Sequence, residues 1–89
     1  MPNKPLFLTK HAQDMVDERE IPLDWIERVL DAPVFEEPDT IHIEATRAYA
    51  PIVEFGNRML KVVYYDSGTI IRVITLHFDR RATRRSRRP

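Results

Sequence analysis

The feature that most constrains this chain is a predicted β-hairpin that runs directly into an arginine-rich end. Residues 58–65 and 70–78 are rich in β-branched and aromatic side chains and flank a Gly-containing turn signal at 66–69. The run 79–88 follows without a break and contains six arginines. Because a two-stranded ribbon is not stable alone in water, the upstream residues must cover one of its faces.

The register of this hairpin decides which charged groups share a face. We prefer a three-residue loop at 66–68, with Gly68 left-handed and Tyr65 opposite Thr69. The face to be buried then holds Leu60, Val62, Tyr64, Ile70, Ile74, Leu76 and Phe78, with Arg72 as its one charge. The open face holds Lys61, Val63, Tyr65, Ile71, Val73, Thr75 and His77. The alternative is a two-residue loop at 67–68, which would pair Asp66 with Thr69 and place Lys61 beside Arg72.

Two helices and two strands are predicted ahead of the hairpin. Thr9 is suited to N-cap a helix from 10 to about 20, whose buried stripe is Ala12, Met15, Val16 and Arg19. A second helix begins near Leu23, ends before Pro33, and presents Trp25, Ile26, Val29 and Leu30 as its apolar face. A short strand at 34–37 and an alternating strand at 41–50 follow, and 51–57 is predicted to be a loop.

These elements predict one α+β domain over residues 1–79, in which two N-terminal helices pack on one face of a three- to four-stranded antiparallel sheet. Residues 80–89 are expected to form a basic C-terminal arm that does not pack, since Ala82 is its one apolar residue. The chain has no cysteine, and no apolar segment approaches the roughly 20 residues needed to cross a bilayer. We therefore expect a cytoplasmic protein with no membrane partner.

The zero net charge of the chain conceals a strong asymmetry. Residues 1–57 carry 12 acids and 5 bases, a net charge of −7, whereas residues 58–89 carry 9 bases and 2 acids, a net charge of +7. The basic half can steer an anionic partner. The alternatives are neutralisation of one layer by the other within the molecule, and a homo-oligomer in which the basic arm meets the acidic layer of another copy.

Short motifs along most of the chain resemble a known family. Lys10-His11-Ala12, Asp17-Glu18-Arg19 and the segment 73–81 resemble small bacterial and archaeal proteins classed only as a domain of unknown function. That family is similar to toxins of the RelE and BrnT type, and residues 80–85 resemble the Arg/Lys-Ala-Thr-Arg-Arg ending of BrnT toxins. BrnT-type sequences carry Lys-His-Gly between their helices where this chain reads Arg19-Glu20-Ile21, which leaves His11 as the histidine of the helical half. The resemblance implies a ribonuclease that cleaves messenger RNA and is held inactive by an antitoxin.

Residues suited to metal-free RNA cleavage are present. The reaction needs a base for the 2′-hydroxyl, cations for the charge on phosphorus and an acid for the leaving oxygen. We assign proton transfer to His77 or His11, charge stabilisation to Lys61 with Arg80 or Arg81, and an acid or base-stacking role to Tyr65 or Tyr49. RNA binding is assigned to Arg80, Arg81, Arg84 and Arg85.

Each of these residues also has a structural interpretation. His77 at a strand end can be a half-exposed structural residue, His11 can bond a backbone carbonyl at the helix edge, and His42 is expected to be solvated. The three histidines lack the spacing of metal ligands, so we expect no metal and no cofactor. The predicted function is a toxin-like, metal-independent endoribonuclease with RNA and an antitoxin protein as partners; the alternative is a non-catalytic RNA- or protein-binding module that uses its arginine arm.

Overall fold

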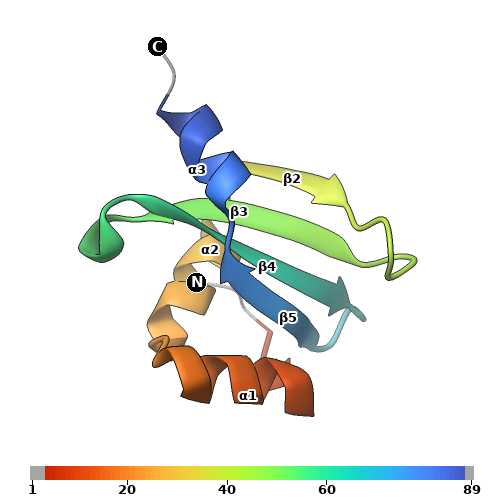
Figure 1. Cartoon of the computed structure of the whole chain (residues 1–89). Helices are drawn as coiled ribbons and strands as arrows, with labels where there is room; N and C mark the ends of the chain where they lie inside the picture. The colour runs from red at the N-terminus through yellow and green to blue at the C-terminus, as the bar shows by residue number, and fades with distance from the viewer. Residues whose placement is uncertain (1–3, 88–89) are drawn as a thin grey trace.

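The computed structural model describes residues 4–87 and has the α+β class that the sequence predicts. The elements in chain order are β1 (Leu6–Leu8), α1 (Lys10–Arg19), α2 (Leu23–Asp31), β2 (Phe35–Pro38), β3 (Thr46–Ile52), a 3-10 turn (Val53–Phe55), β4 (Arg58–Asp66), β5 (Ile71–Phe78) and α3 (Arg80–Ser86). The sheet order is β1-β5-β4-β3-β2, with β1 parallel to β5 and every other neighbour antiparallel. The sheet is therefore five-stranded and mixed, because β1 adds to the free edge of β5. Figure 1 shows α1 and α2 below the sheet and α3 above it.

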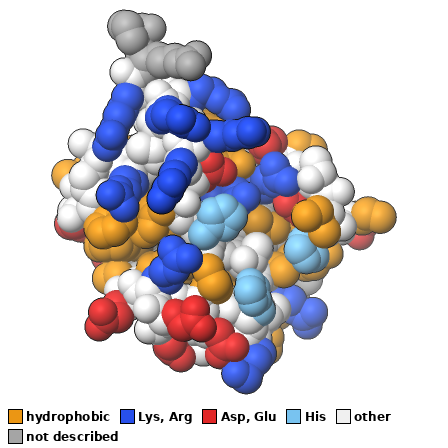
Figure 2. All heavy atoms as spheres, in the orientation of Figure 1, with side chains coloured by type: hydrophobic (Ala, Val, Ile, Leu, Met, Phe, Trp, Pro, Cys, Tyr) orange, Lys and Arg blue, Asp and Glu red, His pale blue; other side chains and the backbone are white. Residues whose placement is uncertain are grey.

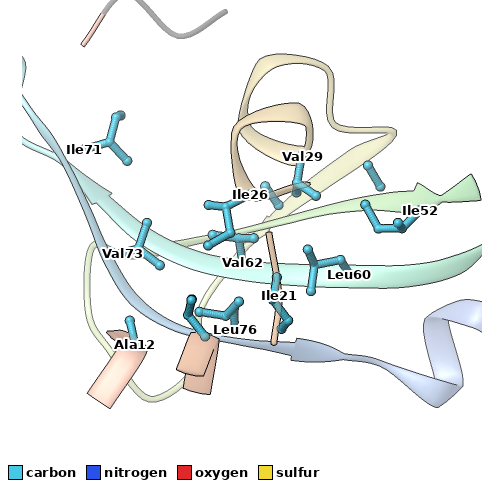
Figure 3. Close-up of a cluster of buried hydrophobic side chains, with 13 residues drawn as sticks. Ala12, Ile21, Ile26, Val29, Ile52, Leu60, Val62, Ile71, Val73 and Leu76 are labelled. Atoms are coloured by element: carbon cyan, nitrogen blue, oxygen red, sulfur yellow. The ribbon is translucent and has the colours of Figure 1, made fainter. Parts of the chain in front are cut away.

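The main core lies between the two N-terminal helices and one face of the sheet (Figure 3). The helices contribute Ala12 and Val16 from α1 and Ile26 and Val29 from α2, residues spaced so that they share one helix face. The sheet contributes Ala48, Ala50, Ile52, Leu60, Val62, Ile71, Val73 and Leu76. The opposite face of these strands is left open except where α3 packs on it, and it is the face that carries the charged side chains described below.

Local signals set the ends of the first two helices as predicted. The Thr9 hydroxyl accepts a hydrogen bond from the Ala12 amide at 3.2 Å, which caps α1. Glu20 then adopts a left-handed conformation with φ 52°, and α1 ends there. Pro22 stands directly before α2, where its missing N–H costs no helical hydrogen bond.

The hairpin register differs from both predicted loops. Asp66 pairs with Ile71, and the four-residue loop 67–70 is closed by a 3.1 Å bond from the Ser67 amide to the Ile70 carbonyl. A β-bulge at Ile74 shifts the register between Val63 and Tyr64. The bulge reverses the alternation beyond it. Consequently Ile71 and Val73 join the buried face and Arg72 the open one, contrary to the prediction, while Lys61, Tyr65, Thr75 and His77 share the open face as predicted.

The strand predicted at 41–50 is wrong over its first half. Residues 41–45 belong to a loop in which Ile41 and Ile43 are 79% and 83% exposed, and β3 begins only at Thr46. The loop is organised by Asp39, whose carboxylate accepts from the Ile41 and His42 amides at 3.1 and 2.7 Å. It also accepts from Arg47 Nε at 2.7 Å. These bonds to one buried carboxylate outweigh the apolar alternation that the sequence shows.

Replacing Asp39 by asparagine is expected to lower the free energy of unfolding by about 1–3 kcal/mol at pH 7, because buried donors lose a charged acceptor. Burial acts to raise the pKa of Asp39, but the bonds from His42 and Arg47 outweigh it and hold that pKa well below its ordinary value. The stabilisation is therefore complete above the pKa of an unfolded aspartate, about 4, and declines as the pH falls. Urea unfolding of the wild type and the variant should show that the difference between their free energies of unfolding narrows from pH 7 to pH 2.5. A difference that stays constant would contradict this account.

The C-terminal segment is packed, which corrects the expectation that it forms an unpacked arm. Asp79 Oδ1 accepts from the Ala82 amide at 2.9 Å and so caps α3, and Ala82 and Thr83 are buried. Ala82 packs with Tyr49 and Met59, while the Met59 amide donates to Thr83 Oγ1 at 2.9 Å. The Ala82 methyl and the Thr83 hydroxyl pack α3 against the sheet. Two such small contacts are not evident from the composition of an arginine-rich segment. Residues 88 and 89 of the predicted arm lie outside the described residues.

Within residues 4–87, the helices are all too short and too polar to traverse a lipid bilayer.

Candidate functional site

A row of four side chains crosses the open face of the sheet, one from each of four strands. Phe35 pairs with Tyr49, Tyr49 pairs with Lys61, and Lys61 pairs with His77. The rings of Phe35 and Tyr49 stack with their centroids 4.3 Å apart. Residues directly opposite each other on antiparallel strands have Cβ atoms about 5 Å apart. The Lys61 ammonium and the His77 imidazole are thus immediate neighbours on one surface.

A second histidine reaches the same surface from the start of α1. Thr75 lies two residues before His77 on β5, and its hydroxyl is 3.1 Å from His11 Nε2. Alternate residues of a strand point to the same side and lie about 7 Å apart. The His11 imidazole therefore reaches the side of β5 that carries His77, at Thr75, the neighbouring position on that side. The partner of His11 is a side-chain hydroxyl and not the backbone carbonyl that the structural interpretation expected.

The surroundings of His77 favour its neutral form. Burial lowers the pKa of this half-buried imidazole below its ordinary value, and the positive charge of Lys61 lowers that pKa further. The carboxylate of Asp79 acts in the opposite direction, and the more distant Arg19 and Arg47 reinforce Lys61. At neutral pH His77 is consequently an acceptor for a proton and not a donor.

Asp79 connects the row of Phe35, Tyr49, Lys61 and His77, here called the histidine row, to the C-terminal helix. Its Oδ1 caps α3, and its Oδ2 lies 4.0 Å from Lys61 Nζ. Burial acts to raise the pKa of Asp79, but the Ala82 amide and the charge of Lys61 outweigh it and hold the pKa below its ordinary value. Asp79 therefore stays ionised at neutral pH and holds Lys61 near the point where α3 begins.

A strongly positive cleft of about 460 Å³ lies where β5 runs into α3. Its lining contains five arginines, Arg19, Arg58, Arg80, Arg84 and Arg87, together with Phe78, Asp79 and Thr83. Arg80 and Arg84 of α3 and Arg87, which directly follows that helix, fall at i, i+4 and i+7, and we call them the arginine stripe. Figure 2 shows Lys and Arg side chains gathered around α3 and down to a histidine on the sheet face. Five cations against one carboxylate give this cleft a positive charge that favours an anionic ligand.

A family model for a domain of unknown function, DUF4258, matches residues 8–83. The chain belongs to the DUF4258 family. This agrees with the resemblance to small proteins classed only as a domain of unknown function. No curated protein and no solved structure matches the chain. The DUF4258 match begins before α1 and ends within α3, so it includes the histidine row and Arg80 but stops before Arg84 and Arg87.

The DUF4258 domain brings together three of the four residues predicted to act in catalysis. Lys61 and His77 pair directly, and His11 joins them through Thr75. Tyr65 lies apart, because it pairs with Arg72 four residues along β4 from Lys61, about 13 Å away. The tyrosine beside Lys61 is instead Tyr49.

Tyr49, the alternative that the sequence left open, is buried beside Lys61. It is 4% exposed and lies between the Phe35 ring and the Ala82 methyl on α3. Burial raises the pKa of Tyr49, the negative charges of Glu37 and Asp79 raise it further, and Arg47 acts against them. Its phenol is therefore protonated at neutral pH.

The arginines divide into two groups. Of the four predicted to bind RNA, Arg80 and Arg84 line the cleft, whereas Arg81 and Arg85 are exposed elsewhere on α3. The prediction missed Arg19, Arg58 and Arg87 as lining residues. Residues 80, 84 and 87 do show a helical spacing in the sequence, but that signal has meaning only once the segment is known to be a helix. Among residues 4–87, no group of three or more His, Asp and Glu side chains is placed to hold a metal ion.

Proposed function

We propose that this DUF4258 protein is a metal-independent RNA endoribonuclease of the kind found in toxin–antitoxin modules. The observation that carries the proposal is the pairing of a neutral His77 with Lys61 on an open sheet face, next to a cleft lined by five arginines. The pair supplies the base and a cation for RNA cleavage, the arginine cleft supplies the surface that binds the substrate, and the acid for the leaving oxygen is assigned below.

In the proposed reaction the ribose 2′-hydroxyl attacks the adjacent phosphorus while His77 accepts its proton. The O2′–P bond forms, the P–O5′ bond breaks, and the ends released are a 2′,3′-cyclic phosphate and a 5′-hydroxyl. Lys61 lies beside His77 and stabilises the additional negative charge on the phosphoryl oxygens. His11, on the same face, is the group we assign to protonate the departing O5′.

The arginine cleft serves to bind the substrate in this proposal. Guanidinium groups bind pairs of phosphate oxygens through their planar fork, so a stripe of them follows an RNA backbone. Arg80 stands nearest in sequence to Asp79 and the histidine row, while Arg84 and Arg87 continue the stripe along α3. A strand bound along the stripe would leave one of its phosphates at the His77–Lys61 pair.

The toxin–antitoxin setting rests on the resemblance to RelE- and BrnT-type toxins, above all in residues 80–85. On this proposal the protein acts in the cytoplasm on messenger RNA, and an antitoxin protein inhibits it by covering the basic surface. The basic surface meant here is the arginine cleft, which is formed by α3 together with Arg19 of α1 and Arg58 of β4.

The decisive test is incubation of the purified full chain with a long single-stranded RNA at pH 7 in the presence of EDTA. Cleavage with 2′,3′-cyclic phosphate ends is the expected result, because neither the base nor the charge-stabilising groups depend on a metal. RNA that remains intact under these conditions overturns the proposal.

A non-catalytic RNA-binding module is the second candidate, and the arginine cleft favours it because binding requires no chemistry at His77. Such a module would bind the same RNA without cutting it. Since each phosphate contact releases counterions, the affinity should fall steeply between low and high salt. Replacing Arg84 by glutamate should weaken this binding more than replacing Arg85, which does not line the cleft.

A further inference from the structure

An aromatic cluster of Trp25, Phe55 and Phe78, here called the aromatic wall, adjoins the arginine cleft. The ring centroids of Trp25, Phe55 and Phe78 lie 4.7 to 6.3 Å apart, and Phe78 lines the cleft itself. Phe55 is 42% exposed although it packs on Phe78. It sits in the 3-10 turn that ends at Gly56, whose φ of 67° suits a glycine and turns the chain back into β4. The cluster therefore presents an accessible ring at the lip of a cationic cleft.

Arg58 connects the aromatic wall to the cations. Its guanidinium carbon lies 4.7 Å from the centroid of the Phe55 ring, and the same side chain lines the cleft. Arg87, directly after α3, donates from Nη2 to the Gly56 carbonyl at 2.7 Å, which ties the end of α3 to the turn that carries Phe55. A free inorganic anion needs only the guanidinium groups. An exposed ring beside them fits a ligand that has both a phosphate and a flat apolar face, which is a nucleotide.

We infer that the cleft binds unpaired RNA, with one nucleobase stacked on Phe55 and the neighbouring phosphates held by Arg58 and the arginine stripe of α3. This rests on the proposed function and deepens it by naming the substrate as single-stranded. Bases within a duplex are stacked on one another and cannot offer a face to a protein ring. A double-stranded RNA would therefore reach the arginines without reaching Phe55.

The chain contains a matched control for this site. Phe7 on β1 is 53% exposed, and the guanidinium carbon of Arg72 lies 5.7 Å from its centroid. The pair resembles Phe55 with Arg58, but neither residue lines the arginine cleft. A change at Phe7 thus reports the general effect of removing an exposed ring beside an arginine.

The test measures binding separately from cleavage. Trp25 is the one tryptophan of the chain, and its ring lies 6.1 Å from that of Phe55, so its fluorescence reports events at the aromatic wall. The probe is a 2′-O-methyl oligouridine, which cannot be cut, of about eight nucleotides, within the size range of single-strand sites. A duplex of the same length and inorganic tripolyphosphate are the comparison ligands.

Phe55→Leu is expected to weaken binding of the single strand by about 5- to 150-fold, the range found when a base-stacking ring is removed. Phe55→Trp should retain the affinity, and Phe7→Leu should leave it unchanged. Binding of tripolyphosphate should be the same in all four proteins, and the duplex should bind no more weakly to Phe55→Leu than to the wild type. Circular dichroism would confirm that each variant is folded.

Each outcome distinguishes this inference from the proposed function. Single-strand binding that is unaffected by Phe55→Leu, or that falls no more than tripolyphosphate binding does, overturns the base site and leaves the ribonuclease standing. Tight, Phe55-dependent binding of the oligouridine together with intact long RNA supports the base site and rejects the ribonuclease. Failure of the wild-type protein to bind the single strand rejects both.

Discussion

Substitution of His77 by alanine is expected to lower the rate of RNA cleavage by about 10²- to 10⁴-fold, the usual contribution of a positioned general base. The loss should appear in the maximal rate and not in the affinity for RNA, because the arginine cleft that binds the strand is unchanged. His77 is half-buried on the open face and outside the main core, so the variant should remain folded. Single-turnover cleavage of a labelled RNA, with binding measured in parallel, separates the two effects.

His42→Gln is the matched control, since His42 lies in the Asp39 loop, where its Nδ1 is 3.0 Å from the Asp39 carboxylate. Its cleavage rate should equal that of the wild type. A His77→Ala protein that cleaves as fast as the wild type would remove the imidazole from the mechanism.

His77 also sets the expected pH dependence of the cleavage rate. Burial and the charge of Lys61 place the pKa of His77 below that of a free histidine, about 6.5. A base with a lowered pKa stays deprotonated to lower pH, so the acid limb of the cleavage rate should lie below pH 6.5. Lys61→Met removes the positive neighbour and should move this limb upward.

Replacement of Leu60 by alanine is expected to lower the free energy of unfolding by about 2–5 kcal/mol. Leu60 lies on β4, the middle strand of the sheet, and its side chain is fully buried within the main core (Figure 3). The total stability of a domain of this size is about 4–13 kcal/mol, at the usual 0.05–0.15 kcal/mol per residue. The variant should therefore be partly or largely unfolded at physiological temperature.

Urea unfolding followed by Trp25 fluorescence would measure this loss. Val53→Ala is the matched control, because Val53 is an aliphatic residue that is 71% exposed. Its free energy of unfolding should change by less than about 0.5 kcal/mol. A loss below about 1 kcal/mol for Leu60→Ala would mean that the core closes around the missing side chain.

The sequence predicted the helices and the hairpin strands well because their signals are local. Thr9 caps α1, Pro22 and Pro33 bracket α2, and the turn at Gly56 precedes β4. The hairpin register was wrong because it depends on a four-residue loop and a bulge at Ile74, neither of which alters the apolar alternation that a sequence shows. β1 was missed as a strand since three residues carry no periodicity, and its partner β5 lies at the other end of the sequence.

The candidate site was predicted in part. Parity alone placed Lys61 and His77 on one face, but the preferred loop would have set Lys61 opposite Val73, and only the observed register makes it the direct neighbour of His77. The cleft could not be predicted, because Arg19 and Arg58 approach α3 through tertiary packing across most of the chain. Tyr65 was assigned to the site because it shares the open face with Lys61. That assignment did not consider the four residues along β4 that separate the two side chains.

The seven-residue length of α3 links ligand binding to the integrity of the C-terminal segment. An isolated helix of this length does not persist in water, so its helical form depends on the attachment of Ala82 and Thr83 to the sheet. A polyanion that engages several guanidinium groups only in their helical arrangement must also favour that attachment. Binding of the polyanion and attachment of α3 to the sheet are then thermodynamically coupled. Slower amide hydrogen exchange in residues 80–86 would be the signature of a bound strand.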